Sequence, residues 1–207
     1  MYELRVPLLR KEVEDTQTML DEHKKEWALK GCSLLSDGWR DNVAQKEIIN
    51  FLINSPKGSV FIKSMDVSEV SKDANLMFNI LDEMIEEVGE QNVVQVVTDN
   101  ASAYVKAGKL LEAKRPHLYW TPCAAHCIDL MLEDIGKIPK VHNILKKAIF
   151  MNGFIYSYVP LVNMMRRFTG QRNLHRPGIT RFATSFITLS QYHKQKNNLR
   201  KLVTSED

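Results

Sequence analysis

The sequence lacks acidic residues between Asp134 and Glu206, although this stretch contains many basic ones. It holds thirteen of them: Lys137, Lys140, Lys146, Lys147, Arg166, Arg167, Arg172, Arg176, Arg181, Lys194, Lys196, Arg200 and Lys201. The whole chain has 28 basic and 25 acidic residues, and its net charge of +3 does not by itself indicate a nucleic-acid-binding protein. The uneven distribution favours either a polyanion or an acidic protein partner for the C-terminal third.

Other absences narrow the class of protein further. No apolar run approaches the ~20 residues that a membrane span needs, and no apolar leader opens the sequence, so no membrane role is expected. The three cysteines are an odd number, which predicts a reduced intracellular protein without structural disulfides, in the nucleus or the cytoplasm. No repeat or low-complexity tract is present, which excludes a solenoid.

The remaining composition is that of a globular α/β protein. Hydrophobic residues make up 44% of the 207 residues, enough for a core. Hydrophobic periodicity and turn signals predict helices and strands in a definite order. The expected helices are 7–30, 73–90, 101–114 and 124–135, and the expected strands are 32–36, 46–54, 59–67, 93–98 and 119–121. Beyond Pro139 the pattern is helical, with breaks at Pro160 and at Pro177-Gly178.

Two carboxylates follow apolar strands. Asp37 ends the strand that begins at Cys32, and Asp99 follows the β-branched run 93–98, which is expected to be covered on both faces. Ligands of open α/β sheets bind at the carboxyl ends of the strands. If these strands are neighbours, their carboxylates repel, and Mg²⁺ or Mn²⁺ is expected between them. The alternative is that Asp99 only caps the helix that follows it.

Four motifs occur in one order along the chain. They are Ser36-Asp37-Gly38-Trp39-Arg40-Asp41, Val97-Thr98-Asp99-Asn100-Ala101-Ser102, Pro122-Cys123-Ala124-Ala125-His126-Cys127-Ile128-Asp129-Leu130 and Thr180-Arg181-Phe182. Together they resemble the hAT-type transposases, and specifically the transposase-like DUF659 domain of plant proteins, with Phe182 where that family usually has Trp. The resemblance runs from about Glu3 to about Tyr192.

The resemblance implies a fold and a division of the chain. The implied fold is RNase H-like: a mixed five-stranded sheet whose first three strands are antiparallel, flanked by helices on both faces, with a C-terminal helical extension. Residues 1–30 would be a helical lead-in and 31–138 the RNase H-like core. Residues 139–207 would begin a basic helical insertion.

The resemblance also implies roles for individual residues. Asp37 and Asp99 would be the first two acids of an Asp-Asp-Glu triad that performs metal-assisted phosphoryl transfer on DNA, supported by Cys123 and His126. The third acid of that family is a Glu beyond the insertion, where this sequence has no counterpart. The prediction is therefore a catalytically incomplete remnant that binds DNA or protein in the nucleus. The alternatives are an active transposase domain whose Glu comes from a longer chain, and an intracellular interaction domain without a nucleic-acid role.

Several other side chains are candidates for binding. Cys123, His126 and Cys127 are zinc-ligand types, but zinc needs four ligands and no second cluster follows at finger spacing. Trp39 either stacks on a base or packs at the sheet edge. Five arginines either contact phosphates or are solvated surface charges: Arg166, Arg167, Arg172, Arg176 and Arg181.

The helical extension is rich in aromatic residues. Phe150, Phe154, Ile155, Tyr156 and Tyr158 are expected to be exposed if the insertion lacks its returning segment. The sequence therefore predicts aggregation, a homodimer, or a partner that supplies the missing segment.

Overall fold

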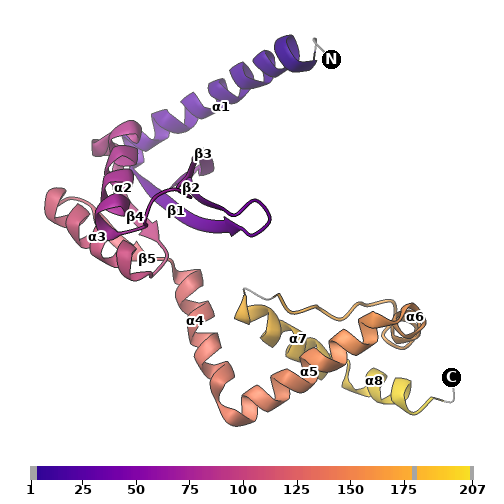
Figure 1. Cartoon of the computed structure of the whole chain (residues 1–207). Coiled ribbons are helices and arrows are strands. Elements are labelled where there is room, and N and C mark those ends of the chain that lie inside the picture. The colour runs from indigo at the N-terminus through magenta and orange to yellow at the C-terminus, as the bar shows by residue number, and fades with distance from the viewer. Residues whose placement is uncertain (1–3, 179–180, 206–207) are drawn as a thin grey trace. The chain divides into compact units, whose positions relative to one another are not determined.

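The computed structural model describes residues 4–178 and 181–205, so Thr180 and Glu206 lie outside the described residues. Contacts divide the chain into two compact units, Met1–Cys123 (unit 1) and Ala124–Asp207 (unit 2), whose elements are labelled in Figure 1. The predicted boundaries at residues 31 and 139 separate the helical lead-in, the RNase H-like core and the helical insertion that the resemblance implies. The division into two compact units does not test these boundaries, and they stay predictions.

Unit 1 is built on one mixed sheet of five strands. They are β1 (Cys32–Asp41), β2 (Lys46–Ser55), β3 (Gly58–Asp66), β4 (Val93–Thr98) and β5 (Tyr119–Pro122). The spatial order is β3-β2-β1-β4-β5. The pairs β1–β2 and β2–β3 are antiparallel, whereas β1–β4 and β4–β5 are parallel. This order and these directions are those of an RNase H-like sheet, so the predicted fold class is confirmed.

Strand β1 is longer than its apolar run predicts. It pairs with β2 as far as Asp41, but its pairing with β4 stops at Leu35. Asp37 therefore lies inside β1 and not at its end, which corrects the prediction. The reason is that the antiparallel partner extends the strand after the apolar residues stop. Asp37 is nevertheless beyond the last residue that β4 pairs with.

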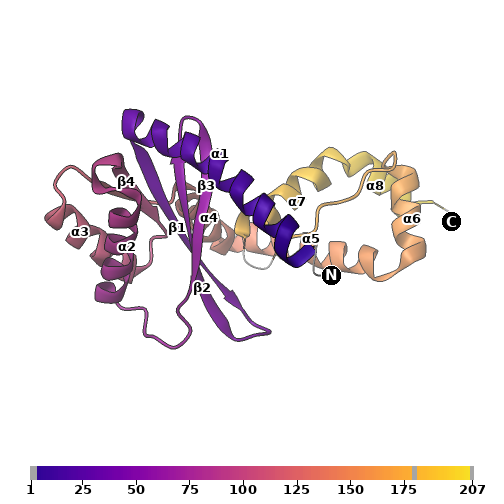
Figure 2. The ribbon, with the colours of Figure 1, turned by 90° about the horizontal axis from the view of Figure 1, so that it is seen from above.

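Helices cover one face of this sheet. Helix α2 (Ala74–Val88) and helix α3 (Ser102–Lys114) lie side by side on it, as Figures 1 and 2 show. The side chain of Asp73 caps α2 by accepting a hydrogen bond from the Leu76 N–H at 2.8 Å. Apolar residues of α2 at helical spacing pack in one buried cluster with residues of the strands. In this cluster Leu81 comes from α2, Leu34 from β1 and Phe51 from β2. We call this side of the sheet the core face.

A buried arginine joins α2 to the segment that follows α3. Arg115 is 2% exposed and forms ion pairs with Asp82, Glu86 and Glu90. Glu90 belongs to a short 3-10 turn, Glu90–Asn92, that leads into β4. The charge of Arg115 is thus compensated by two carboxylates of α2 and one of the turn, which a buried charge requires.

The opposite face, which we call the site face, is less covered than the predicted arrangement of helices on both faces requires, so that part of the prediction was wrong for the described residues of unit 1. A row across four strands, formed by Val97, Leu35, Leu52 and Phe61, is half-buried except for Phe61, which is 57% exposed. Val94 is 46% exposed, so the prediction that this strand is covered on both faces was wrong. A register shift between Cys32 and Ser33 in the β1–β4 pairing leaves Val94 without a partner in β1.

The N-terminal helix packs against the rest of unit 1 with its C-terminal half, from Leu20 onwards. A π-helical turn (Leu4–Leu8) leads into α1 (Leu9–Lys30). Trp27 near its C-terminus is buried in the core, whereas Leu9 and Val13 are more than half exposed. Glu26 fixes this end by accepting hydrogen bonds from the Ser55 hydroxyl and the Lys57 N–H at 2.6 and 2.9 Å.

Unit 2 is helical. It contains α4 (Ala124–Lys137), α5 (Pro139–Ser157), α6 (Val159–Phe168), α7 (Phe182–Lys194) and α8 (Lys196–Val203). Pro160 lies in the first turn of α6, so it begins a helix, as a proline in that position does. No single described helix is long and apolar enough to cross a membrane; α5 and α6 together pass that test but are bent by 112° at their junction.

Candidate functional site

The strand register brings Asp37 and Asp99 to one face of the sheet. Ser33 pairs with Gln95 and Leu35 with Val97 across β1 and β4. Side chains alternate between the faces of a sheet, so the next residues on this face are Asp37 and Asp99. The Ser33 hydroxyl donates a hydrogen bond to Gln95 Oε1 at 3.0 Å, which shows that partners in this row face each other. The pairing itself ends at Leu35 and Val97, so the acids lie one step past the last paired residues of this row.

Asp99 is held by the turn that starts α3. Its Oδ1 accepts a hydrogen bond from the Ala101 N–H at 2.7 Å. Ala101 is the residue that precedes α3, and no side-chain hydrogen bond caps the helix there, so Asp99 stabilises the turn before the helix and the capping interpretation was wrong. The preceding residue, Thr98, is fully buried, and its hydroxyl accepts a hydrogen bond from Trp120 Nε1 at 3.1 Å. Its carbonyl accepts another from the Cys123 N–H at 2.6 Å. The end of β4 is therefore fixed to β5 from two sides.

Asp37 is in a different environment. It is exposed, and it forms no hydrogen bond or ion pair with any residue that the structure describes. Trp39, two residues further along β1, pairs with Ile48 and is 48% exposed. Its half-exposed ring is compatible with both the packing and the stacking interpretation. Asp37 thus offers both carboxylate oxygens to solvent or to a ligand.

A buried tyrosine lies within electrostatic reach of both acids. Tyr104, in the first turn of α3, is 6% exposed. Burial raises the pKa of its hydroxyl, the nearby Ser36 hydroxyl offsets part of this rise, and the carboxylates of Asp99 and Asp37 add to it. The Ser36 hydroxyl is itself buried without a hydrogen bond of good geometry among the described residues. Sequence reasoning missed Tyr104, although its position one turn after Asp99 was a signal.

The donor set fits one hard divalent cation and not two. Mg²⁺ is commonly held by one or two carboxylates, with water and phosphate completing its shell. Within residues 4–178 and 181–205, no three or more His, Cys, Asp or Glu side chains are grouped so as to hold a metal. This finding covers Cys123, His126 and Cys127, of which His126 is exposed and the two cysteines are half-buried. Two metals would need a third acid that the sequence does not place here.

The basic side chains of unit 2 are almost all on the surface. Arg167, Arg172, Arg176 and Arg181 are exposed, and Arg166 is half-buried. Arg166 donates a hydrogen bond to Asn173, and Arg176 lies 4.1 Å from the ring centre of Tyr156. Unit 2 has thirteen basic and five acidic residues, a net charge of +8, whereas unit 1 has fifteen and twenty, a net charge of −5.

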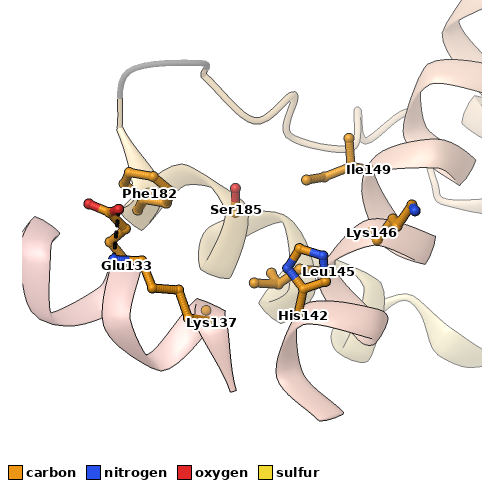
Figure 3. Close-up of a pocket in the computed structure, with 9 residues that line it drawn as sticks. Glu133, Lys137, His142, Leu145, Lys146, Ile149, Phe182 and Ser185 are labelled. Atoms are coloured by element: carbon orange, nitrogen blue, oxygen red, sulfur yellow. Dashed lines mark ion pairs between the residues drawn. The ribbon is translucent and has the colours of Figure 1, made fainter. Parts of the chain in front are cut away.

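A groove of about 490 Å³ lies between α4, α5 and α7 within unit 2 (Figure 3). Leu145, Ile149 and Phe182 form apolar parts of its wall. Glu133 and Lys137 of α4 form an ion pair at 3.0 Å beside it. Sequence reasoning did not find this groove, because its walls come from helices up to 50 residues apart.

The fold defines the class of protein: an RNase H-like domain, with one carboxylate inside β1, beyond its pairing with β4, and one directly after β4. The chain belongs to the family described as "Domain of unknown function (DUF659)", whose model matches residues 1–149.

Comparisons with individual proteins add little to this assignment. Among curated proteins, none matches the sequence. Among solved structures, the chain is similar to the catalytic core domain of BIV integrase, with a TM-score of 0.33 and 12% identity over 79% of this chain and 97% of that one. A likeness at this level carries no argument about function. The fold assignment therefore rests on strand order and direction.

Proposed function

We propose that this chain is a catalytically incomplete, transposase-derived domain of the hAT type that binds DNA through unit 2. The observation that carries the proposal is the acid pair, because Asp37 and Asp99 extend a row of facing side chains on adjacent parallel strands. The order of the four sequence motifs supports the hAT assignment. A DNA-binding role would also imply residence in the nucleus.

The acid pair would hold one Mg²⁺ or Mn²⁺ ion. When bound, such an ion supplies a Lewis acid that polarises a phosphate oxygen. Asp99 would present its carboxylate in a fixed orientation, since the turn to Ala101 already binds one of its oxygens. Asp37, free of protein partners among the described residues, would approach the same ion from β1. Tyr104 and Ser36 would close the core side of this edge to water.

Catalytic incompleteness follows from the donor set. Clamping both the attacking and the leaving oxygen in phosphoryl transfer takes a two-metal site. Two carboxylates cannot complete such a site, so the chain should bind a cation weakly and should not cleave DNA. If a longer chain or a partner supplied a Glu at this edge, the same domain would be part of an active transposase.

A nicking assay tests this part of the proposal. Supercoiled plasmid is incubated with the chain and Mn²⁺, and we expect no nicked product above the level of a protein-free control. Nicking that disappears in Asp99→Asn would overturn incompleteness, because that variant keeps an acceptor for the Ala101 N–H but loses the charge. Nicking that persists in this variant would indicate a contaminating nuclease.

Salt dependence tests the DNA-binding part. Basic side chains that neutralise phosphates release counterions, so affinity falls steeply as salt rises. We expect the chain to bind a labelled duplex at low salt, and we expect Lys146→Ala and Lys147→Ala together to reduce the salt slope. The matched control is Lys106→Ala with Lys109→Ala, two exposed lysines of α3 in the acidic unit, which should leave the slope unchanged. Absence of binding at low salt would contradict the proposal.

A second candidate function is protein interaction. Phe150 is 76% exposed, Phe154 54% and Tyr158 58%, and the last two rings contact each other edge to face. Ile155 is buried and Tyr156 half-buried, so the predicted exposure holds for three of the five residues. Light scattering tests this candidate: we expect self-association that Phe150→Ser with Phe154→Ser reduces. A monodisperse monomer would contradict it.

A further inference from the structure

Two of the sequence motifs meet in unit 2 through Asp129. This residue lies on α4, three residues after His126, and its carboxylate faces the first turn of α7. Oδ1 accepts a hydrogen bond from the Ala183 N–H at 2.9 Å, and Oδ2 accepts one from the Phe182 N–H at 3.3 Å. The carboxylate therefore satisfies two of the N–H groups that a helix leaves unpaired at its start. It does so from another helix, 53 residues earlier in the sequence.

The same helix start is held from its other side by Thr184. The Thr184 hydroxyl donates a hydrogen bond to the Arg181 carbonyl at 2.6 Å and accepts one from the Gly178 N–H at 2.7 Å. Arg181 is the residue that precedes α7, with an extended backbone and an exposed side chain. The peptide unit that follows the Arg181 side chain is thus held at both of its polar groups, its carbonyl by Thr184 and its N–H by Asp129.

We propose that Asp129 is a positioning residue that holds Arg181 for contact with a phosphate of DNA; this inference rests on the proposed DNA-binding function. Fixing the peptide unit beside a long side chain reduces the conformational entropy that is lost when the side chain binds a phosphate. The N–H groups of the α7 terminus are already occupied by Asp129, so the end of this helix is not available to a phosphate. The exposed guanidinium of Arg181 is then the group beside this helix start that can bind a phosphate.

Phe182 shares this positioning. Its N–H is bound by Asp129 and its ring forms part of the wall of the groove between α4, α5 and α7 (Figure 3). Loss of the Asp129 carboxylate should therefore loosen Arg181 and Phe182 together, while the rest of α7 stays helical.

If Asp129 positions Arg181, removing its carboxylate should weaken DNA binding, whereas charge repulsion alone predicts that it strengthens binding. Removing a carboxylate from a DNA-binding surface reduces repulsion and strengthens binding. Asp134→Ala is the matched control, because Asp134 is an exposed acid on the same helix, paired with Lys137; we expect it to bind a short labelled duplex slightly more tightly than the unaltered chain. Asp129→Ala removes the same charge, yet we expect it to weaken binding, by about threefold to tenfold, and to lower the salt slope by about one counterion.

Two further variants separate positioning from folding. Asp129→Asn keeps one oxygen acceptor, for the Ala183 N–H, and loses the second one, so it should restore part of the affinity that Asp129→Ala loses. Arg181→Ala should weaken binding by the same factor as Asp129→Ala, and adding Asp129→Ala to it should cost nothing more. Hydrogen exchange without DNA should show faster exchange at both Phe182 and Ala183 in Asp129→Ala, and near-normal exchange at Ala183 alone in Asp129→Asn.

The outcomes distinguish this inference from the function on which it rests. If the unaltered chain shows no salt-dependent DNA binding, the proposed function fails, and the positioning role with it. If the chain binds DNA but Asp129→Ala binds as tightly as Asp134→Ala does, only the positioning role is overturned. Additive losses in the Asp129→Ala, Arg181→Ala double variant would also overturn it, since Asp129 would then not act through Arg181.

Discussion

The two units of this chain differ in charge and in what their charged residues do. Unit 1 has a net charge of −5, and many of its charged side chains pair with one another, as Arg115 does with three carboxylates. Unit 2 has a net charge of +8, and its long acid-free stretch leaves most basic side chains exposed. In the first unit, charged side chains such as Arg115 thus stabilise the fold that carries the acid pair. The second has its basic side chains on the surface, which the proposed contact with DNA requires.

The units also differ in packing. The core of unit 1 joins Trp27 of α1, Leu34 and Phe51 of the sheet and residues of α2 and α3 in one buried cluster. The described core of unit 2 is smaller, centred on Ile155, Met165 and the last helix. A rigid sheet suits a site that orients carboxylates, whereas a lightly packed helical unit can adjust to a partner. The predictions below test this contrast, from the largest expected effect to the smallest.

The largest effect is expected at Arg115. Arg115→Met should lower the free energy of unfolding of unit 1 by about 3–5 kcal/mol, because it removes the buried member of the ion-pair network, and with it two hydrogen bonds to the mostly buried Asp82. All three tryptophans of the chain belong to unit 1, so tryptophan fluorescence in a denaturant titration reports this unit alone. Hydrogen exchange in α5 should remain unchanged.

Lys114 provides the control for that experiment. It is exposed and pairs with Asp82, the same acid that Arg115 contacts. Lys114→Ala should cost less than about 1 kcal/mol, as exposed ion pairs do. Equal losses for the two variants would contradict the view that burial of Arg115 is what locks α2 to α3.

Two glycines should respond to alanine with opposite signs. A Cβ on Gly108 would lie 2.3 Å from the ring of Trp120, which is itself bound to Thr98 beside Asp99. Gly108→Ala should therefore destabilise unit 1 by about 1–3 kcal/mol through overpacking. Gly153, inside α5, has nothing within 4 Å of such a Cβ, and alanine there should stabilise unit 2 by about 0.5–1 kcal/mol.

Far-UV circular dichroism together with tryptophan fluorescence would separate these two changes. The first variant should shift the fluorescence transition to lower denaturant, and the second should shift only the helical signal to higher denaturant. A stabilising effect of Gly108→Ala would mean that Trp120 has room to move and that α3 is not fixed against β5.

The smallest effect is expected at Tyr192. Burial raises the pKa of its hydroxyl to about 12, and the nearby Tyr156 adds to the rise. A raised pKa gives stability that is fully present below the unfolded pKa of about 10 and is lost as pH rises toward 12. Tyr192→Phe should remove this loss of stability of unit 2 between about pH 10 and about pH 12. Near neutral pH it should be neutral or stabilise by about 1 kcal/mol, since the buried hydroxyl has no partner among the described residues. Loss of stability at neutral pH would contradict this.

Much of unit 1 could be predicted from local sequence pattern. The β-branched run 93–98 and the amphipathic stretch around Leu81 are signals contained in a few consecutive residues, and the structure places β4 and α2 there. The length of β1 could not be predicted, because β2 extends it past the apolar residues. The reach of Tyr104 to both acids depends on how α3 lies on the sheet. The capping of α7 by Asp129 joins residues 53 positions apart, and no local pattern records such a contact.

The central claim is that Asp37 and Asp99 form one weak site for a divalent cation. Titration of Mn²⁺ into isotopically labelled protein tests it most directly, because a bound paramagnetic ion broadens nearby amide resonances. We expect broadening centred on the neighbours of both acids in the unaltered chain, and none there in Asp37→Asn or Asp99→Asn. Broadening that is absent from this edge, or that survives in either variant, would contradict the account.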